Sequence, residues 1–340
     1  MGYGSYKASD WAKLKQSRGI SSTSGASEIF KGNQLQDKYN PKFISVRESR
    51  DSDDSPNSTP IILAFDVTGS MGYLAAEIAK NSLNKTAVEL YDKRPVPDPH
   101  IMCAAITCPS ADGGLQVTQF EADIRVVEQL LDLRVGFGGN MFSYDSLVWY
   151  FAAKHTSIDC FEKRGKKGFL FTIGDEICGD RRGETLSSNE IKAVFDDNVS
   201  ADLPLRDVYN MAAEKYEIFH IVADRYSSFE GWDAFMPGRV AYIAGSDIAY
   251  LSEVITSIMQ VANGMDKTLV IQQWAEDVQD TVKRAIANIN LDEQPKKVEV
   301  PQPKKAEAPQ DEKVDEPKEK IEGDKNESSI SRWKKFWGRR

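Results

Sequence analysis

Residues 61–72 read IILAFDVTGSMG and indicate the fold class of the chain. The first five are all apolar, which is typical of a short strand buried on both faces. Asp66, Thr68 and Ser70 then occupy alternate positions in a glycine-containing turn, and residues 73–92 repeat apolar side chains at helical spacing. The stretch therefore predicts a strand, a turn and a helix, which is the repeating unit of an α/β domain.

The same alternation continues along the chain. Bounded apolar runs predict six strands, at residues 61–67, 100–108, 115–120, 168–173, 217–223 and 239–243. Helical spacing predicts six helices, at residues 73–92, 121–133, 144–156, 204–216, 246–263 and 269–289. We expect a doubly wound, mostly parallel central sheet with helices on both faces and disordered extensions at either end. The ADGG turn at 111–114 predicts one antiparallel edge strand, because glycine permits the positive φ of a tight hairpin. Such sheets bind ligands at the carboxyl ends of their strands.

Composition divides the 340 residues into four parts. Residues 1–57 are rich in Ser, Gly, Lys and Asp and predict a mobile polar arm, whose single aromatic residues would let parts of it lie against the domain. Residues 58–290 form the predicted domain. Half of residues 291–330 are Asp, Glu or Lys, which predicts a disordered charged linker. Residues 331–340 end the chain as a basic, aromatic peptide.

Charge and hydropathy exclude several classes of protein. The formal net charge of −9 argues against a nucleic-acid-binding protein, which needs a basic face to displace counterions from phosphates. No apolar run approaches a membrane span or the core of a signal peptide, so we expect a cytoplasmic protein. The sequence contains only three histidines, so few side chains are available for a zinc site or for histidine-based catalysis.

The polar side chains of the opening stretch indicate a particular kind of ligand. Asp66, Thr68 and Ser70 offer only hard oxygen atoms, which suit magnesium, manganese or calcium better than zinc or copper. Asp66 alone would also serve as an ordinary helix N-cap. A second loop in the same strand context would favour the metal site, and "FLFTIGDE" provides one by placing Asp175 directly after an apolar strand.

These loops resemble those of the von Willebrand factor A domains. "DVTGS" at 66–70 is similar to the D-x-[ST]-x-S motif that opens the metal-ion-dependent adhesion site of that family, and Asp175 matches the aspartate that follows its fourth strand. A third family loop carries a Thr near two glycines. Here "GFGGNMFSYD" has Gly138 and Gly139 but lacks the Thr, and either Asn140 or Ser143 could supply the oxygen.

The resemblance implies a non-enzymatic function. Family members hold a divalent cation, which we expect to be Mg²⁺ with Mn²⁺ or Ca²⁺ as alternatives, and leave one coordination position for an acidic residue of a protein ligand. Intracellular bacterial and phage members are often adaptors for MoxR-like ATPases or parts of larger assemblies.

Two alternatives stay open. An enzyme of the phosphatase type would use Asp66 as a nucleophile, but such motifs need a second Asp two residues later, where this chain has Thr68. The terminal peptide has Trp333, Phe336 and Trp337 at helical spacing among basic residues. It would dock either in a groove of a partner or on an anionic membrane surface.

Overall fold

The fold is taken from a computed structural model that describes residues 8–21, 23–30, 32, 34–68, 71, 77, 83–109, 113–135, 144–179, 185–224 and 231–291. All of them belong to one compact unit, residues 1–296.

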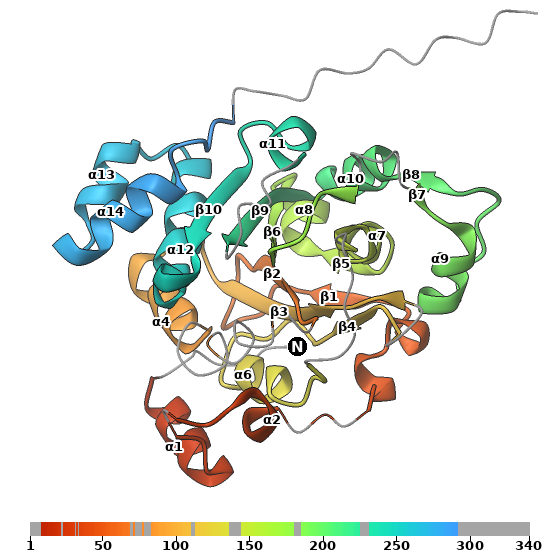
Figure 1. Ribbon diagram of the computed structural model, residues 1–340, viewed down its shortest axis with the longest axis horizontal. Helices are drawn as coiled ribbons and strands as arrows, with labels where there is room; N and C mark the ends of the chain where they lie inside the picture. The colour runs from red at the N-terminus through yellow and green to blue at the C-terminus, as the bar shows by residue number, and fades with distance from the viewer. Residues whose placement is uncertain are drawn as a thin grey trace, which may run out of the picture. The chain divides into compact units, whose positions relative to one another are not determined.

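A six-stranded sheet forms the centre of this unit (Figure 1). Its strands lie in the order β10-β9-β6-β2-β3-β4. All neighbouring pairs are parallel except β3 with β4, which is antiparallel. The strands are β2 (Thr59–Asp66), β3 (Pro99–Ile106), β4 (Leu115–Val117), β6 (Gly168–Gly174), β9 (Tyr216–Asp224) and β10 (Val240–Ala244). The predicted fold class and its antiparallel edge strand are thereby confirmed.

The sheet is buried on both faces, as its apolar strands require. Every residue of β2, β3 and β6 is buried. Alternate residues of each strand contribute to two separate hydrophobic clusters, one on each face. At the β3–β4 turn, Gly113 and Gly114 have φ values of 82° and 81°, the left-handed region expected of this hairpin.

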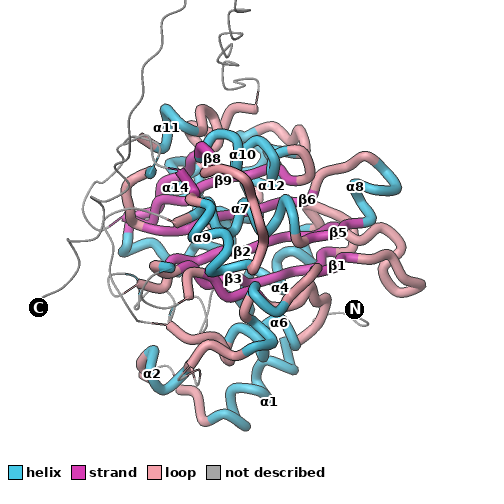
Figure 2. The backbone as a smooth tube through the Cα atoms, turned by 90° about the vertical axis from the view of Figure 1, so that its right-hand side faces the viewer, coloured by secondary structure: helices cyan, strands magenta, loops and turns pink. Residues whose placement is uncertain are grey.

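Helices cover the two faces in two groups, and Figure 2 shows them on either side of the strands. The first group comprises α1 (Ala8–Arg18), α2 (Ala26–Ile29), α4 (Leu83–Lys93), α6 (Arg125–Leu130), α12 (Leu251–Ala262), α13 (Lys267–Gln272) and α14 (Glu276–Ala285). The second comprises α7 (Asp145–Lys154), α8 (Asp159–Arg164), α9 (Ser188–Phe195), α10 (Leu205–Ala213) and α11 (Trp232–Phe235). Short 3-10 helices among the described residues include η1 (Asp37–Tyr39), η2 (Pro41–Phe43) and η6 (Gly245–Tyr250).

Several predicted helix boundaries differ from those observed. The helix expected over 246–263 is divided into η6 and α12, and the one expected over 269–289 into α13 and α14. The helices α8, α9 and α11 were not predicted, because segments of four to eight residues are too short to show a clear period. Within the described part of the chain, no helix combines the length and the apolarity needed to cross a lipid bilayer.

The N-terminal segment lies against the domain through some of its single aromatic residues, as the sequence allows, although its polar composition predicts a mobile arm. Trp11, Ile29 and Tyr39 are buried in the hydrophobic cluster on one face of the sheet. The side chain of Asp132, which follows α6, accepts hydrogen bonds from Arg18 and from the Tyr39 hydroxyl, each at 3.2 Å. These contacts join residues about a hundred positions apart, so local composition does not reveal them.

The end of this segment is a strand. β1 (Arg47–Ser49) pairs in parallel with β5 (Thr156–Ile158), and Figure 2 shows the two side by side. A second small sheet pairs β7 (Thr185–Leu186) with β8 (Leu203–Pro204). The β1–β5 pair attaches the N-terminal segment to the connection between α7 and α8.

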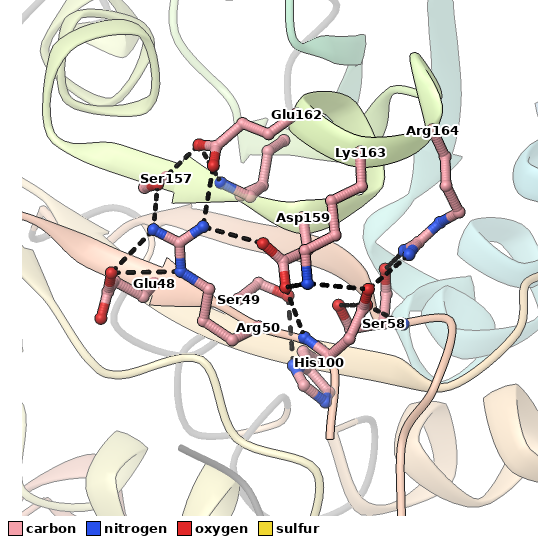
Figure 3. Close-up of polar contacts among 12 residues, drawn as sticks. Glu48, Ser49, Arg50, Ser58, His100, Ser157, Asp159, Glu162, Lys163 and Arg164 are labelled. Carbon is pink, nitrogen blue, oxygen red and sulfur yellow. Dashed lines mark hydrogen bonds and ion pairs between the residues drawn. The ribbon is translucent and has the colours of Figure 1, made fainter. Parts of the chain in front are cut away.

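Charged side chains fix the end of β1 (Figure 3). Arg50 donates to Asp159 and Glu162 on α8 and to Glu48, with all three nitrogen–oxygen distances at 2.8 Å. The backbone N–H of Asp51 donates to Asp159, also at 2.8 Å. The Arg164 guanidinium donates a hydrogen bond to Asp51 at 2.6 Å. Burial alone would raise the pKa of Asp51, but this bond and those from Ser58 lower it to about 2. Residues 47–51 are therefore held by α8 as well as by β5.

Candidate metal centre

The candidate site begins where β2 ends. Asp66 is the last residue of that strand, and both it and Thr68 are buried. The backbone N–H of Thr68 donates to Asp66 Oδ1 at 2.7 Å, which closes a tight turn around the carboxylate. Spacing by two residues produces this arrangement, because the side chain of an Asp reaches the amide two positions later.

Strand alternation places further polar residues on the same face as Asp66. Thr172 of β6 pairs in register with Ala64 on one side and with His220 of β9 on the other. Ala64 is two residues before Asp66, so the side chains of Asp66, Thr172 and His220 all point toward the face covered by α7. The N-terminal residue of that helix is Asp145.

A small cavity of about 10 Å³ lies where these elements meet, at the lower limit for one water molecule. It is lined by Asp66, Thr68, Ile106, Thr107, Tyr144, Asp145, Gly174, Glu176 and His220.

The acidic side chains of this site repel one another. The pKa of Asp66 is raised to about 6, mainly by burial and further by the charges of Asp145 and Asp175. The hydrogen bond from the Thr68 N–H opposes this shift. Burial and the nearby acids Asp66, Asp175 and Asp145 likewise raise the pKa of Glu176 to about 10. Three buried carboxyl groups, those of Asp66, Asp145 and Glu176, thus lie near one another and near the half-buried Asp175, and a positive charge would be strongly favoured there.

An aromatic pair supports one side of the cavity. The His220 ring stacks on Trp232 of α11 with 3.6 Å between ring centroids. His220 Nδ1 lies 2.8 Å from Thr172 Oγ1 and 3.3 Å from Asp145 Oδ2. The Trp232 indole N–H donates to the backbone oxygen of Glu176 at 2.9 Å. The ring stack therefore fixes the loop after β6 relative to β9.

Two buried polar atoms at the cavity lack a hydrogen-bond partner in the part of the chain that the structure describes, namely Asp145 Oδ2 and His220 Nε2. Asp145 is 4 % exposed and His220 1 % exposed. The 3.3 Å contact between Asp145 Oδ2 and His220 Nδ1 is close enough for an ion pair but does not have hydrogen-bond alignment. A carboxylate oxygen left without a partner at such burial is costly, and a bound cation would satisfy it.

The donor set fits a hard divalent cation. Asp66, Thr68, Asp145 and Glu176 present carboxylate and hydroxyl oxygens, the ligands of Mg²⁺, Mn²⁺ and Ca²⁺. Among the described residues, however, no three His, Cys, Asp or Glu side chains already stand as a metal-binding group.

The structure brings together some of the predicted site residues and leaves others undescribed. Asp66 and Thr68 line the cavity, and Asp175 acts on Asp66 through its charge. Ser70, Asn140 and Ser143 lie outside the described residues.

Two acids at the site were not predicted as ligands. Asp145 begins a helix directly after the glycine-pair loop, and this position was the available signal. Glu176 follows Asp175 in a loop, where acids are usually solvated, yet it is only 9 % exposed.

Comparisons with known proteins leave the family unassigned. Neither a protein-family model nor a curated protein matches the sequence. Among solved structures, two similar chains are crystal structures of the pilus adhesin SpaC from Lactobacillus rhamnosus GG. One, in the open conformation, has 7 % identity and a TM-score of 0.41 over 63 % of this chain and 31 % of the adhesin. The other has 9 % identity and a TM-score of 0.40 over 63 % and 32 %. The chain thus spans about a third of the length of these adhesin chains, and similarity at this level assigns neither family nor function.

Proposed function

We propose that this chain contains a von Willebrand factor A domain that binds a divalent cation and, through that cation, a protein ligand. The observation that carries the proposal is the convergence of Asp66, Thr68 and Asp145 on one buried cavity, with Asp145 Oδ2 lacking a hydrogen-bond partner among the described residues. The motif in the sequence and the position of the cavity at the carboxyl ends of parallel strands agree with this.

The cation would be held by the carboxylates of Asp66 and Asp145 and the hydroxyl of Thr68, with Asp175 acting directly or through water. Ser70 and either Asn140 or Ser143 complete the proposed set. When bound, the ion supplies positive charge that neutralises the clustered acids and attracts a further carboxylate. Mg²⁺ is the expected ion, and Mn²⁺ and Ca²⁺ take the same class of ligand.

The partner is proposed to be a protein that presents an acidic residue, such as a MoxR-like ATPase or a component of a larger assembly in the cytoplasm. The function of the chain would then be protein binding without catalysis, and this binding would depend on the metal. The terminal peptide at 331–340 would add a second contact, either with that partner or with an anionic membrane.

Calorimetric titration with MnCl₂ tests the metal site. We expect saturable binding by the wild type and a loss of at least about 100-fold in affinity for Asp66→Ala, because that change removes a buried carboxylate ligand. Asp207→Ala is the matched control, since Asp207 is an exposed acid on α10. Equal affinity of the wild type and Asp66→Ala would refute the site.

A pull-down from an extract of the source cells tests the dependence on metal. Partners should be retained in Mg²⁺ and lost both in chelator and with Asp66→Ala. Equal retention under all conditions would show that recognition occurs elsewhere on the chain. Hydrolysis of a generic phosphate ester that requires Asp66 would instead favour the phosphatase alternative.

A further inference from the structure

Glu176 is an unusual feature of this site. A loop acid two residues after the end of a strand is normally solvated, but Glu176 is only 9 % exposed and lines the cavity with Asp66 and Thr68. Its Oε1 accepts a hydrogen bond from the Thr68 hydroxyl at 3.5 Å. Two oxygens bound at right angles to one cation lie about 3.0 Å apart for Mg²⁺ and about 3.4 Å apart for Ca²⁺. The observed distance is close to the Ca²⁺ value, and the two oxygens would have to approach each other to bind Mg²⁺ together.

The backbone of Glu176 is held in place by a hydrogen bond from Trp232. Its carbonyl oxygen accepts the Trp232 indole N–H at 2.9 Å, and Trp232 is fully buried beneath the stacked ring of His220. Moving the Glu176 backbone would break this bond and leave a buried indole N–H unsatisfied. The carboxyl group thus enters the cavity from a fixed point.

No basic residue compensates this carboxyl group at the cavity. Neither Lys nor Arg occurs among the described residues that line it. The charges that act most strongly on Glu176 are those of three other acids, Asp66, Asp145 and Asp175. A group of acids alone does not define a site, but the unpartnered oxygen of Asp145 independently indicates a ligand.

We propose that Glu176 is an internal ligand of the cation and occupies the coordination position that a partner's carboxylate would otherwise take. The inference rests on the proposed function and deepens it, because the site is then closed by the chain itself. A partner's acidic residue gains access to the ion only by displacing Glu176. The side chain alone can make this movement, since its backbone is fixed by Trp232.

Mn²⁺ titrations of the full chain test this, with and without sodium acetate at constant ionic strength. The proteins are the wild type, Glu176→Ala, Glu176→Gln and the control Glu214→Gln, which changes an exposed acid at the end of α10. Glu176→Ala should bind Mn²⁺ about 10- to 100-fold more weakly than the wild type. Acetate should restore part of this loss, because it supplies the missing carboxylate. The wild type and the control should not respond to acetate.

Two outcomes would overturn the inference while leaving the proposed function intact. One is Mn²⁺ binding by Glu176→Ala as tight as that of the wild type. The other is an equal gain from acetate in the wild type, which would show that the position is already open. If Glu176→Ala does not fold, the nearly isosteric Glu176→Gln decides, since unchanged affinity there would also refute an anionic ligand. Equal Mn²⁺ binding by the wild type and Asp66→Ala would instead refute the metal site itself.

Discussion

Glu89 is a half-buried acid that lies outside the candidate site. It is on α4, and its Oε2 is buried without a hydrogen-bond partner among the described residues. Burial, together with the charge of Glu253 on α12, raises the pKa of Glu89 to about 8, while Lys85 and Lys93 partly oppose the shift. Lys85 also forms an ion pair with Glu253, which is itself buried. Glu89 therefore stays protonated in the fold at a pH where a free Glu side chain is ionised.

This shift predicts how stability depends on pH. The folded pKa lies above the ordinary value of 4.5, so the folded state binds the proton more tightly than the unfolded state. The stabilising contribution is complete below about pH 4.5 and is lost as pH rises through about 8. Glu89→Gln is neutral throughout and should become more stable than the wild type toward pH 9. Urea unfolding from pH 5 to pH 9 measures this, with Glu214→Gln as the control. Parallel pH profiles for Glu89→Gln and the wild type would contradict it.

At the level of single residues, the sequence predicted only part of the candidate site. Asp66 and Thr68 were identifiable because both belong to one turn, and their spacing is visible in the chain. Asp145 and His220 reach the same cavity from α7 and β9, so their proximity depends on strand order and register. A single sequence contains the alternation of strands but not the order in which they pair.

Among the elements, β1 is held at its end by charged contacts with α8. Arg50, which directly follows β1, has a side chain that is 28 % exposed, whereas its partner Asp159 on α8 is 4 % exposed. The pair lies between a surface ion pair, worth about 0–1 kcal/mol, and a fully buried one, whose disruption costs about 3–5 kcal/mol. Removing Arg50 would leave Asp159 with Lys163 and the Asp51 N–H as its remaining contacts.

We therefore expect Arg50→Ala to lower the free energy of unfolding by about 1–3 kcal/mol. The matched control is Arg284→Ala, because Arg284 also pairs with an acid, Asp247, but its own side chain is 64 % exposed. The control should cost less than about 1 kcal/mol. Urea denaturation midpoints measure both, and equal losses would show that the contacts of Arg50 do not stabilise β1.

The packing of the N-terminal segment also shows what composition can and cannot predict. Its polar composition agrees with the exposure of many of its side chains. Its few apolar residues, such as Trp11 and Ile29, nonetheless reach positions on the sheet face that only the folded domain creates. Sequence patterns identified the central strands because each is a continuous apolar run, whereas this segment is held by contacts distant in sequence.

In the molecule as a whole, residues 8–57 contribute Ile44 to one of the two hydrophobic layers and most of their buried apolar side chains to the other. Trp11 is 6 % exposed within that layer, while Phe43, in the same segment, is 62 % exposed. Trp11→Ala should therefore destabilise the protein by about 3–5 kcal/mol through the cavity it leaves. Phe43→Ala should change stability by less than about 0.5 kcal/mol. Thermal unfolding followed by circular dichroism compares the two, and a small effect of Trp11→Ala would indicate that the segment is dispensable for the fold.

The central claim is that the carboxyl edge of the sheet holds a divalent cation. Crystals grown in MnCl₂ test it most directly through the anomalous signal of manganese. The account predicts a peak within coordination distance of both the Asp66 carboxylate and the Thr68 hydroxyl, and its absence from crystals of Asp66→Ala. A wild-type map without a peak at this position, from crystals in which manganese binds elsewhere, would contradict the account.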